Sequence, residues 1–178
     1  MNWMIASDLH GSSRYTKALL DAFARESCER LVLLGDILYH GPRNDLPDEY
    51  NPKAVIAMLN PLAGRLFCVR GNCEAEVDQM VLDFPVLADY AVFPWNGKLI
   101  YATHGHVYGE NNPPKLSQGD ILLCGHTHIP ANIAHDGFTY WNPGSVSIPK
   151  NGSARGYMLL TEKSVCWKDL EGNPLSGF

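Results

Sequence analysis

Short apolar runs that stop abruptly at glycine and polar residues recur along this sequence, and the run at residues 121–124 shows the pattern most clearly. Four consecutive apolar residues are typical of a strand that is buried on both faces, and Gly125 ends the run. His126 and His128 follow at positions i and i+2. Because side chains alternate along extended backbone, we expect both imidazoles to point the same way and to form half of a site for a divalent metal ion.

The same pattern recurs at residues 3–7, 31–34, 65–69 and 99–102. The polar residues that follow these runs are Asp8 with His10, then Asp36, Asn72 and His104. A helical pattern that starts at Ser12 or Ser13 and ends near Cys28 separates the first two runs, which predicts a βαβ unit with parallel strands. Functional groups collect at the carboxyl ends of such strands, so we expect these side chains to converge.

The remaining segments predict one domain over residues 1–178. Residues 37–51 are rich in turn formers and predict a loop, and a helix is expected over 52–60 with Pro61 as its stop. Asn96-Gly97 and Asp136-Gly137 lie between apolar runs and predict hairpins. A parallel first half and a hairpin-rich second half indicate an α/β fold, a sandwich of two mixed β-sheets flanked by helices.

Composition limits the classes of partner. The net charge of −5 disfavours a broad nucleic-acid surface, which needs clustered Lys and Arg, so we expect no extended nucleic acid as partner. The five cysteines are odd in number and form no C-x-x-C pair, which suits a reducing compartment. We find no secretory signal and no apolar run near the roughly 20 residues of a membrane span, so we expect a cytoplasmic protein without a membrane partner.

The residues after the apolar runs form a set of oxygen and nitrogen ligands without a thiolate. This set favours Mn, Fe, Co, Ni or Zn over a structural zinc cage. Seven such ligands exceed what one ion with an open position needs, and they suit two ions that share a bridging carboxylate. Two metal ions in one site are the recurring device for hydrolysis of phosphate esters.

In this order, D-x-H, G-D, G-N, H-G-H and G-H-x-H resemble the calcineurin-like metallophosphoesterase superfamily. Residues 36–44, 70–73 and 142–147 resemble its branch of YfcE-type bacterial phosphodiesterases. The resemblance implies a metal-dependent phosphodiesterase with a metallophosphoesterase-like sandwich, two divalent ions, Mn²⁺ as a suitable metal and no organic cofactor. It implies in-line attack on phosphorus by a hydroxide that bridges the two ions. One ion would be held by Asp8, His10, Asp36 and His128, and the other by Asp36, Asn72, His104 and His126.

One position departs from the family. Most of the superfamily has histidine after G-N, where it is thought to help protonate the leaving group, and this chain has Cys73, which the YfcE-type branch shares. A thiol of pKa about 8.5 suits that task less well than an imidazole near 6.5. We expect a preference for good leaving groups, or a substitute acid from His40 or His106. Arg43 and Arg70 are candidates for binding the substrate phosphate, although loop arginines are usually solvated.

Two other functions fit the same residues. A phosphomonoesterase would use the same ligands, because the choice depends on what surrounds the leaving group. A non-enzymatic scaffold is the other alternative, since one eukaryotic retromer subunit resembles this family in fold, but the complete set of expected ligands favours an enzyme. A small phosphodiester is the expected substrate. A homo-oligomer is possible, with Phe93, Trp95 and Trp141 as candidates for either its interface or the core.

Overall fold

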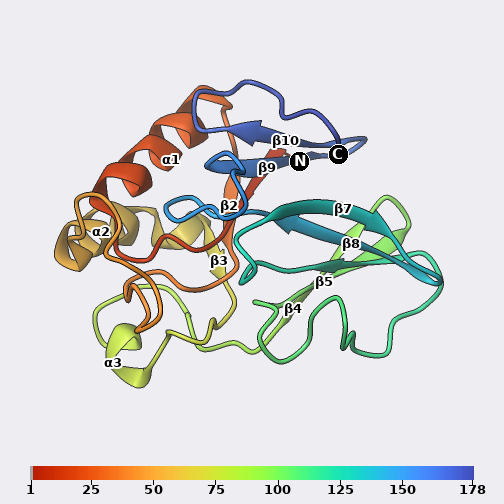
Figure 1. The fold of residues 1–178 in the computed structure, drawn as a ribbon, viewed down its shortest axis with the longest axis horizontal. Helices are drawn as coiled ribbons and strands as arrows, with labels where there is room; N and C mark the ends of the chain where they lie inside the picture. The colour runs from red at the N-terminus through yellow and green to blue at the C-terminus, as the bar shows by residue number, and fades with distance from the viewer. Residues whose placement is uncertain (1) are drawn as a thin grey trace.

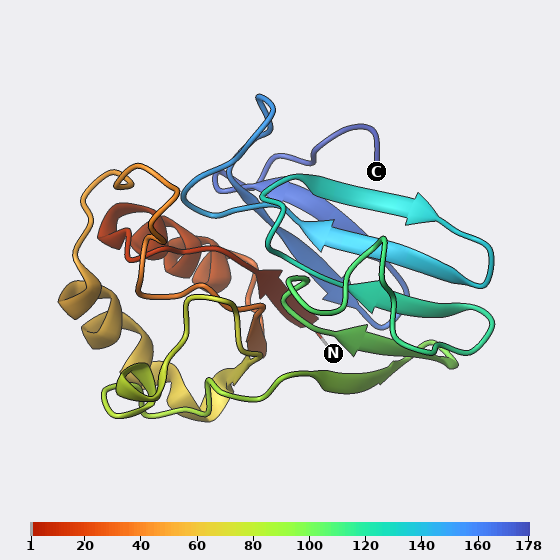
Figure 2. The ribbon, with the colours of Figure 1, turned by 60° about the horizontal axis from the view of Figure 1, so that its bottom comes forward.

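Two β-sheets of five strands each pack against one another (Figure 1). The structure, a computed structural model, describes residues 2–178. The strand orders are β10-β9-β1-β2-β3 and β4-β5-β6-β8-β7. This confirms the predicted α/β sandwich of two mixed sheets. The helices of the described chain lie on the outer side of the first sheet, in agreement with the expectation of helices outside the sandwich (Figures 1 and 2).

The first sheet contains the predicted parallel unit. Strands β1 and β2 pair in parallel, as do β2 and β3, while β9 and β10 extend the sheet in antiparallel fashion. The strands are β1 (Asn2–Ala6), β2 (Arg30–Leu33), β3 (Leu66–Cys68), β9 (Gly156–Thr161) and β10 (Val165–Asp169). The crossover helices are α1 (Ser13–Arg25) and α2 (Pro52–Leu59).

The second sheet combines hairpins with parallel pairs. Its strands are β4 (Ala91–Trp95), β5 (Lys98–Ala102), β6 (Asp120–Leu123), β7 (Pro130–Ala134) and β8 (Phe138–Pro143). The predicted hairpins β4–β5 and β7–β8 are confirmed, and Asn96 and Gly97 both have positive φ as a tight hairpin turn requires. However, β5, β6 and β8 are parallel. The connection from β5 to β6 has no helix, so a crossover could not be predicted from the sequence.

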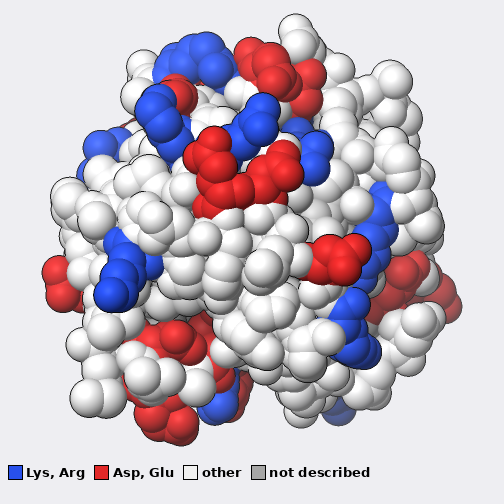
Figure 3. Space-filling model, turned by 60° about the vertical axis from the view of Figure 1, so that its left-hand side comes forward, with Lys and Arg blue, Asp and Glu red and all other residues white. Residues whose placement is uncertain are grey.

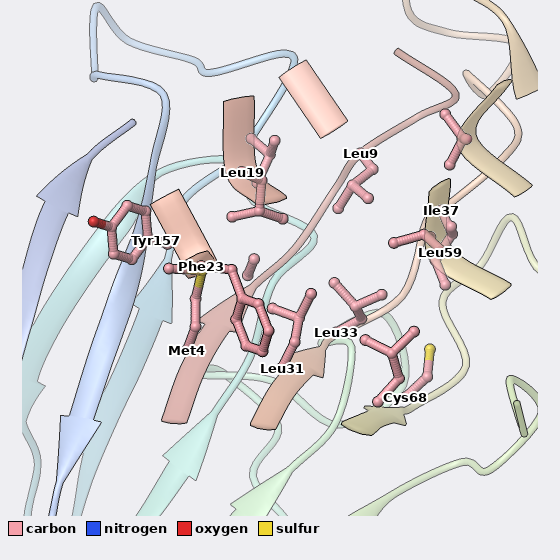
Figure 4. Packing of buried hydrophobic residues seen from close by; sticks show 14 of the residues in the cluster. Met4, Leu9, Leu19, Phe23, Leu31, Leu33, Ile37, Leu59, Cys68 and Tyr157 are labelled. Atoms are coloured by element: carbon pink, nitrogen blue, oxygen red, sulfur yellow. The ribbon is translucent and has the colours of Figure 1, made fainter. Parts of the chain in front are cut away.

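Alternating side chains of the parallel strands enter two different cores. Met4 and Leu31 face α1 and contact its Leu19 and Phe23 on the helix side of the sheet (Figure 4). The neighbouring residues on each strand, such as Ile5, face the second sheet. Burial on both faces explains why these strands are continuous apolar runs. The aromatic residues Phe93, Trp95 and Trp141 also pack into the core between the sheets.

Helices α1 and α2 begin where the sequence predicts, and the structure differs from the prediction after α2 and at α3. Ser12 Oγ accepts a hydrogen bond from the amide of Tyr15, which caps α1. Helix α2 ends before Pro61 as expected, but the chain continues as the 3₁₀ helix η1 (Asn60–Arg65). The short helix α3 (Glu76–Gln79) was not predicted, because four residues are too few to show a periodic pattern. Within residues 2–178, every helix is too short or too polar to cross a bilayer.

Candidate metal centre

The residues expected as metal ligands lie together where strands of both sheets end. Asp8 and His10 follow β1, Asp36 follows β2, and Asn72 follows β3 in the first sheet. His104 follows β5 and His126 with His128 follow β6 in the second sheet. The structure therefore brings all seven side chains to one place.

The backbone at these residues is left-handed and not extended. Asp8, His10, Asp36, His126 and His128 have φ between 47° and 66°, a region that residues other than glycine rarely adopt. The expected extended backbone at His126 and His128 is therefore wrong, although both imidazoles lie in the centre. Such backbone strain is tolerated where the surrounding structure imposes it, and it concentrates at functional sites.

One half of the centre consists of three buried side chains. Asp8 Oδ1 lies 3.6 Å from His10 Nε2 and 3.3 Å from His128 Nε2. The two imidazole Nε2 atoms are 3.3 Å apart. Ligand atoms of these three residues lie within 4.8 Å of one another, which is close enough for one metal ion to contact all of them.

The other half is arranged around His104. Its Nε2 lies 3.2 Å from both Asn72 Oδ1 and His126 Nδ1, and 3.5 Å from Asp36 Oδ2. The same Asp36 Oδ2 lies 3.7 Å from His10 Nε2 in the first half. Asp36 thus stands between the two halves, which is the position that a bridging carboxylate needs.

Hydrogen bonds fix how three of the histidines face the centre. Nδ1 of His10, His104 and His128 lies 2.8, 2.6 and 2.5 Å from the carbonyl oxygens of Tyr39, Leu34 and Ile148 respectively. A carbonyl oxygen only accepts, so each Nδ1 carries a hydrogen, and whenever a ring is neutral its Nε2 lone pair faces the carboxylates.

These lone pairs and carboxylates make the centre rich in electrons and poor in donors. Among the described residues, the buried Asp8 Oδ1 has no hydrogen-bond partner. A buried, uncompensated carboxylate is costly unless a cation or a donor offsets it. The donor set and its geometry therefore fit divalent metal ions.

Protonation of the metal-free centre follows from the same contacts. Burial lowers the pKa of His104, but the carboxylates of Asp36 and Asp8 outweigh it and raise that pKa to about 9. Burial and the neighbouring His104 lower the pKa of His126 to about 4. Burial opposes ionisation of Asp8, yet the imidazoles of His10 and His128 next to its carboxylate hold its pKa far below the usual range. A metal ion would take the place of the proton on His104.

Glu74 is a buried residue of the centre for which the sequence indicated no role. Its Oε2 accepts hydrogen bonds from the amides of Asp36 (2.9 Å) and Gly71 (2.5 Å), and its Oε1 accepts one from Ile37 (2.7 Å). The carboxylate thereby ties the loop after β2 to the loop after β3. Glu74 is visible in the sequence, but no spacing rule distinguishes this buried carboxylate from an exposed one.

The turn at residues 142–145 lies beside the centre. Ser145 Oγ donates to the carbonyl of Asp8 (3.0 Å), and Ser147 Oγ donates to the same oxygen (2.8 Å). Asn142 Nδ2 donates to the carbonyl of Gly125 (2.8 Å). These bonds fix the backbone on both sides of the centre.

Cys73 and His106 contact the ligand set. The Cys73 amide donates to Asp36 Oδ1 (3.0 Å) and its Sγ lies 3.3 Å from Asp36 Oδ2. Burial and the Asp36 carboxylate raise the pKa of the Cys73 thiol, so the thiol is neutral and donates to Asp36. The His106 ring lies 5.4 Å from that of His104 and 6.2 Å from that of His126.

A cavity of about 460 Å³ opens over the centre. Asp36, Asn72, Cys73, His126 and His128 form its floor, and its other lining residues are Gly41, Pro42, Arg43, Asn44, Thr127 and Lys150. Arg43, a candidate for binding the substrate phosphate, thus lines this cavity. Lys150 also lines it, although the sequence alone did not identify this residue.

Two other candidates lie outside this cavity. The His40 ring stands between the rings of Tyr39 and Tyr50, at 4.7 and 5.3 Å. Its buried Nδ1 has no hydrogen-bond partner within the described part of the chain. Arg70 donates its backbone amide to Ala88 O (2.7 Å), and its side chain is not among the lining residues.

Known proteins are similar to this chain in sequence and in fold. The calcineurin-like phosphoesterase superfamily domain matches residues 1–164. Phosphodiesterase YfcE of Escherichia coli K12 is 46% identical over 160 residues, which cover 90% of this chain and 87% of that protein. A solved structure of the E. coli phosphoesterase YfcE superposes with a TM-score of 0.95 at 42% identity, covering 99% of this chain and 97% of the other.

A more distant match shows how widely the fold is used. Vacuolar protein sorting 29 from Cryptosporidium parvum is 16% identical with a TM-score of 0.59, covering 93% of this chain and 88% of that one, and it shares the fold alone. The predicted family is confirmed by the closer matches. This chain belongs to the calcineurin-like phosphoesterase superfamily and is a phosphoesterase.

Proposed function

We propose that this protein hydrolyses small phosphodiesters at a centre of two divalent metal ions. The single observation that carries the proposal is the position of Asp36, whose Oδ2 lies within 3.7 Å of a histidine of each half. Asp8, His10 and His128 would complete one ion's ligands, and Asn72, His104 and His126 the other's. The similarity to phosphodiesterase YfcE supports the diester as substrate class.

The bound ions would lower the pKa of a shared water for in-line attack on phosphorus and neutralise the phosphate. The chain's own groups do the rest. Three backbone carbonyls hold the histidine rings through Nδ1, so that each Nε2 stays aimed at the centre. Arg43 and Lys150 would bind the nonbridging oxygens of the substrate from the cavity wall.

The size and charge of the site support a small substrate over a polymer. The cavity of about 460 Å³ is of the size that holds small molecules. On the face shown in Figure 3, basic and acidic side chains are interspersed. We also propose Mn²⁺ as a serviceable metal and the cytoplasm as the location, which is supported by five cysteines that are all free thiols.

Hydrolysis of bis(p-nitrophenyl) phosphate by chelator-stripped protein tests the proposal. We expect activity to return with Mn²⁺ in the native protein, and not in Asp36→Asn, while the exposed control Asp83→Asn behaves like the native chain. p-Nitrophenyl phosphate, assayed in parallel, separates diesterase from monoesterase. Lack of turnover with Mn, Fe, Co, Ni and Zn, in protein that calorimetry shows to bind two ions, would refute the enzyme and favour a scaffold.

A further inference from the structure

A second cavity, of about 450 Å³, adjoins the metal centre on the side of α2 and α3. We define the apolar groove by six of its lining residues, which are Leu38, Tyr39, Tyr50, Ile56, Val77 and Val81. Among the described residues that line this cavity, Asp78 alone is charged. The cavity over the metal centre, by contrast, is lined by charged and amide side chains.

Two residues connect the apolar groove to the metal centre. Cys73 lines both cavities, and its Sγ lies 3.3 Å from Asp36 Oδ2. Tyr39 lines the groove, and its carbonyl oxygen lies 2.8 Å from His10 Nδ1. A ligand whose phosphorus lies at the metal centre can therefore extend one substituent past Cys73 into the groove.

Three residues of the apolar groove are exposed to solvent. The exposed fractions are 42% for Tyr39, 61% for Val77 and 41% for Val81. Contiguous exposed apolar surface of this kind marks a binding site more often than chance exposure does. Two tyrosine rings in its wall favour a flat, aromatic occupant, because rings pack at defined offsets.

We propose that the apolar groove binds one ester substituent of the substrate, and that this substituent is aromatic. The inference rests on the proposed function, because the phosphate of the same molecule must lie at the metal centre. It assigns the substrate to phosphodiesters with an aromatic ester group. Cys73 acts as the border between the two cavities, where a larger side chain would narrow the passage.

Two inert ligands test the groove without turnover. Dimethylphosphinate and benzyl(methyl)phosphinate each carry one negative charge like a diester, and neither has an ester bond to hydrolyse. Their binding is measured by calorimetry on the Mn²⁺-loaded protein. We expect the benzyl compound to bind about tenfold more tightly. Burying one aromatic ring contributes more free energy than a tenfold change in affinity requires, and the ordering of the bound ligand offsets part of this gain.

Variants locate that gain. Val81→Glu and Val77→Glu place a charge in the apolar groove at exposed positions, and each should abolish the tenfold preference while dimethylphosphinate binds as before. Ile133→Glu on β7 is the matched control, 40% exposed and on the other sheet, and should keep the preference. Equal binding of the two phosphinates by the native protein, or a preference that survives in both groove variants, would overturn the inference.

Two further measurements separate the remaining outcomes. Hydrolysis of bis(p-nitrophenyl) phosphate by the same preparations tests the proposed function separately. Tighter binding of the benzyl compound without hydrolysis would refute the proposed function and support the binding of an aromatic group in the groove. Sedimentation velocity reports on association. A native dimer that Val81→Glu and Val77→Glu dissociate would assign the groove to a second copy of the chain and overturn the inference.

Discussion

Glu74 places a second buried carboxylate beside that of Asp36. Burial raises the pKa of Glu74, and the charge of Asp36 raises it further, while the amide of Ile37 opposes both. Three backbone amides at 2.5 to 2.9 Å make this charge tolerable. One of them belongs to Asp36 itself, so Glu74 positions Asp36 through its backbone.

Replacing Glu74 by glutamine tests that positioning. The amide NH₂ group cannot accept, so at least one backbone N–H loses its partner, and we expect a loss of roughly 3 kcal/mol in the free energy of unfolding of the metal-free protein. Metal affinity should fall as well, because the Asp36 backbone is released. Urea unfolding and metal titration measure the two effects. Glu76→Gln, at an exposed position of α3, is the control, and equal metal affinity in Glu74→Gln would contradict the role.

Cys73 should restrict the range of leaving groups. Its neutral thiol donates to Asp36 and is a weak acid, so departure of the leaving group depends on its own basicity. We expect Cys73→His to flatten the dependence of kcat/KM on leaving-group pKa, measured over a series of aryl methyl phosphates. General acid catalysis contributes roughly 10²-fold or more for poor leaving groups. An unchanged slope would refute the assignment.

The residue scale also shows where prediction from sequence stops. The residue types at strand ends were sufficient to bring seven side chains together, because parallel strands place their carboxyl ends at one edge. The backbone conformation of His126 and His128 was not predictable, since left-handed φ at histidine has no signature in the sequence. Glu74 was missed for a related reason, because its partners are backbone amides of loops.

At the scale of elements, the loops after β2 and β3 are in direct contact. A Cβ atom on Gly71 would overlap Asp36 Oδ1 and would lie 2.6 Å from the Asp36 amide nitrogen. Gly35 meets Gly71 in the same way, with a Cβ position 2.6 Å from the Gly71 Cα. Glycine at both positions therefore permits the approach that places Asp36 between the halves of the metal centre.

Gly71→Ala should therefore disrupt both the loops and the centre. We expect the free energy of unfolding to fall by about 2 kcal/mol or more, as for overpacking at a tight site, together with a loss of metal affinity. Gly64→Ala is a matched control, since a Cβ there meets nothing within 4 Å. Thermal unfolding and metal titration of both variants test this prediction. If Gly71→Ala equals Gly64→Ala in stability and metal affinity, the loops adjust to the added Cβ atom and the prediction is wrong.

Elements were predictable where hydrophobic pattern and capping agree. Ser12 caps α1 and Pro52 begins α2 as the sequence indicated, and buried runs identified the strands of the parallel unit. Parallel pairing of β5 with β6 was not predictable, because residues 103–119 connect them without a helix. The hydrophobic pattern of a segment indicates its burial and its type of secondary structure, whereas the strand that pairs with it depends on contacts distant in sequence.

At the scale of the whole molecule, the metal centre joins the two sheets. Asp8, His10, Asp36 and Asn72 come from the first sheet, and His104, His126 and His128 come from the second. Ions held by both sets would link the sheets at their shared edge, and any ligand that binds only the folded state stabilises it. Metal removal should therefore lower the stability of the entire fold and not only of its loops.

The effect of metal removal should depend on pH through His104. In the metal-free protein its pKa is about 9, against 6.5 for an ordinary histidine, so its protonated form stabilises the fold fully below pH 6.5. That contribution is lost as the pH rises through about 9. A metal ion must displace the same proton, so metal affinity rises with pH up to the same point. Both effects widen the gap between loaded and metal-free protein as the pH rises.

Thermal unfolding with excess Mn²⁺ or with chelator measures this gap. We expect a fixed Mn²⁺ concentration, about 100 times its Kd at pH 6.5, to add about 2.7 kcal/mol at that pH, or roughly 5 °C or more in Tm. The same concentration should add more at pH 8.5, where metal affinity is higher. His104→Gln cannot hold the proton, so its metal-free form should lose less stability over this interval than the native chain does. A gap that narrows with rising pH would mean that the histidine is unprotonated before metal binds, and that the carboxylates of Asp8 and Asp36 do not control it.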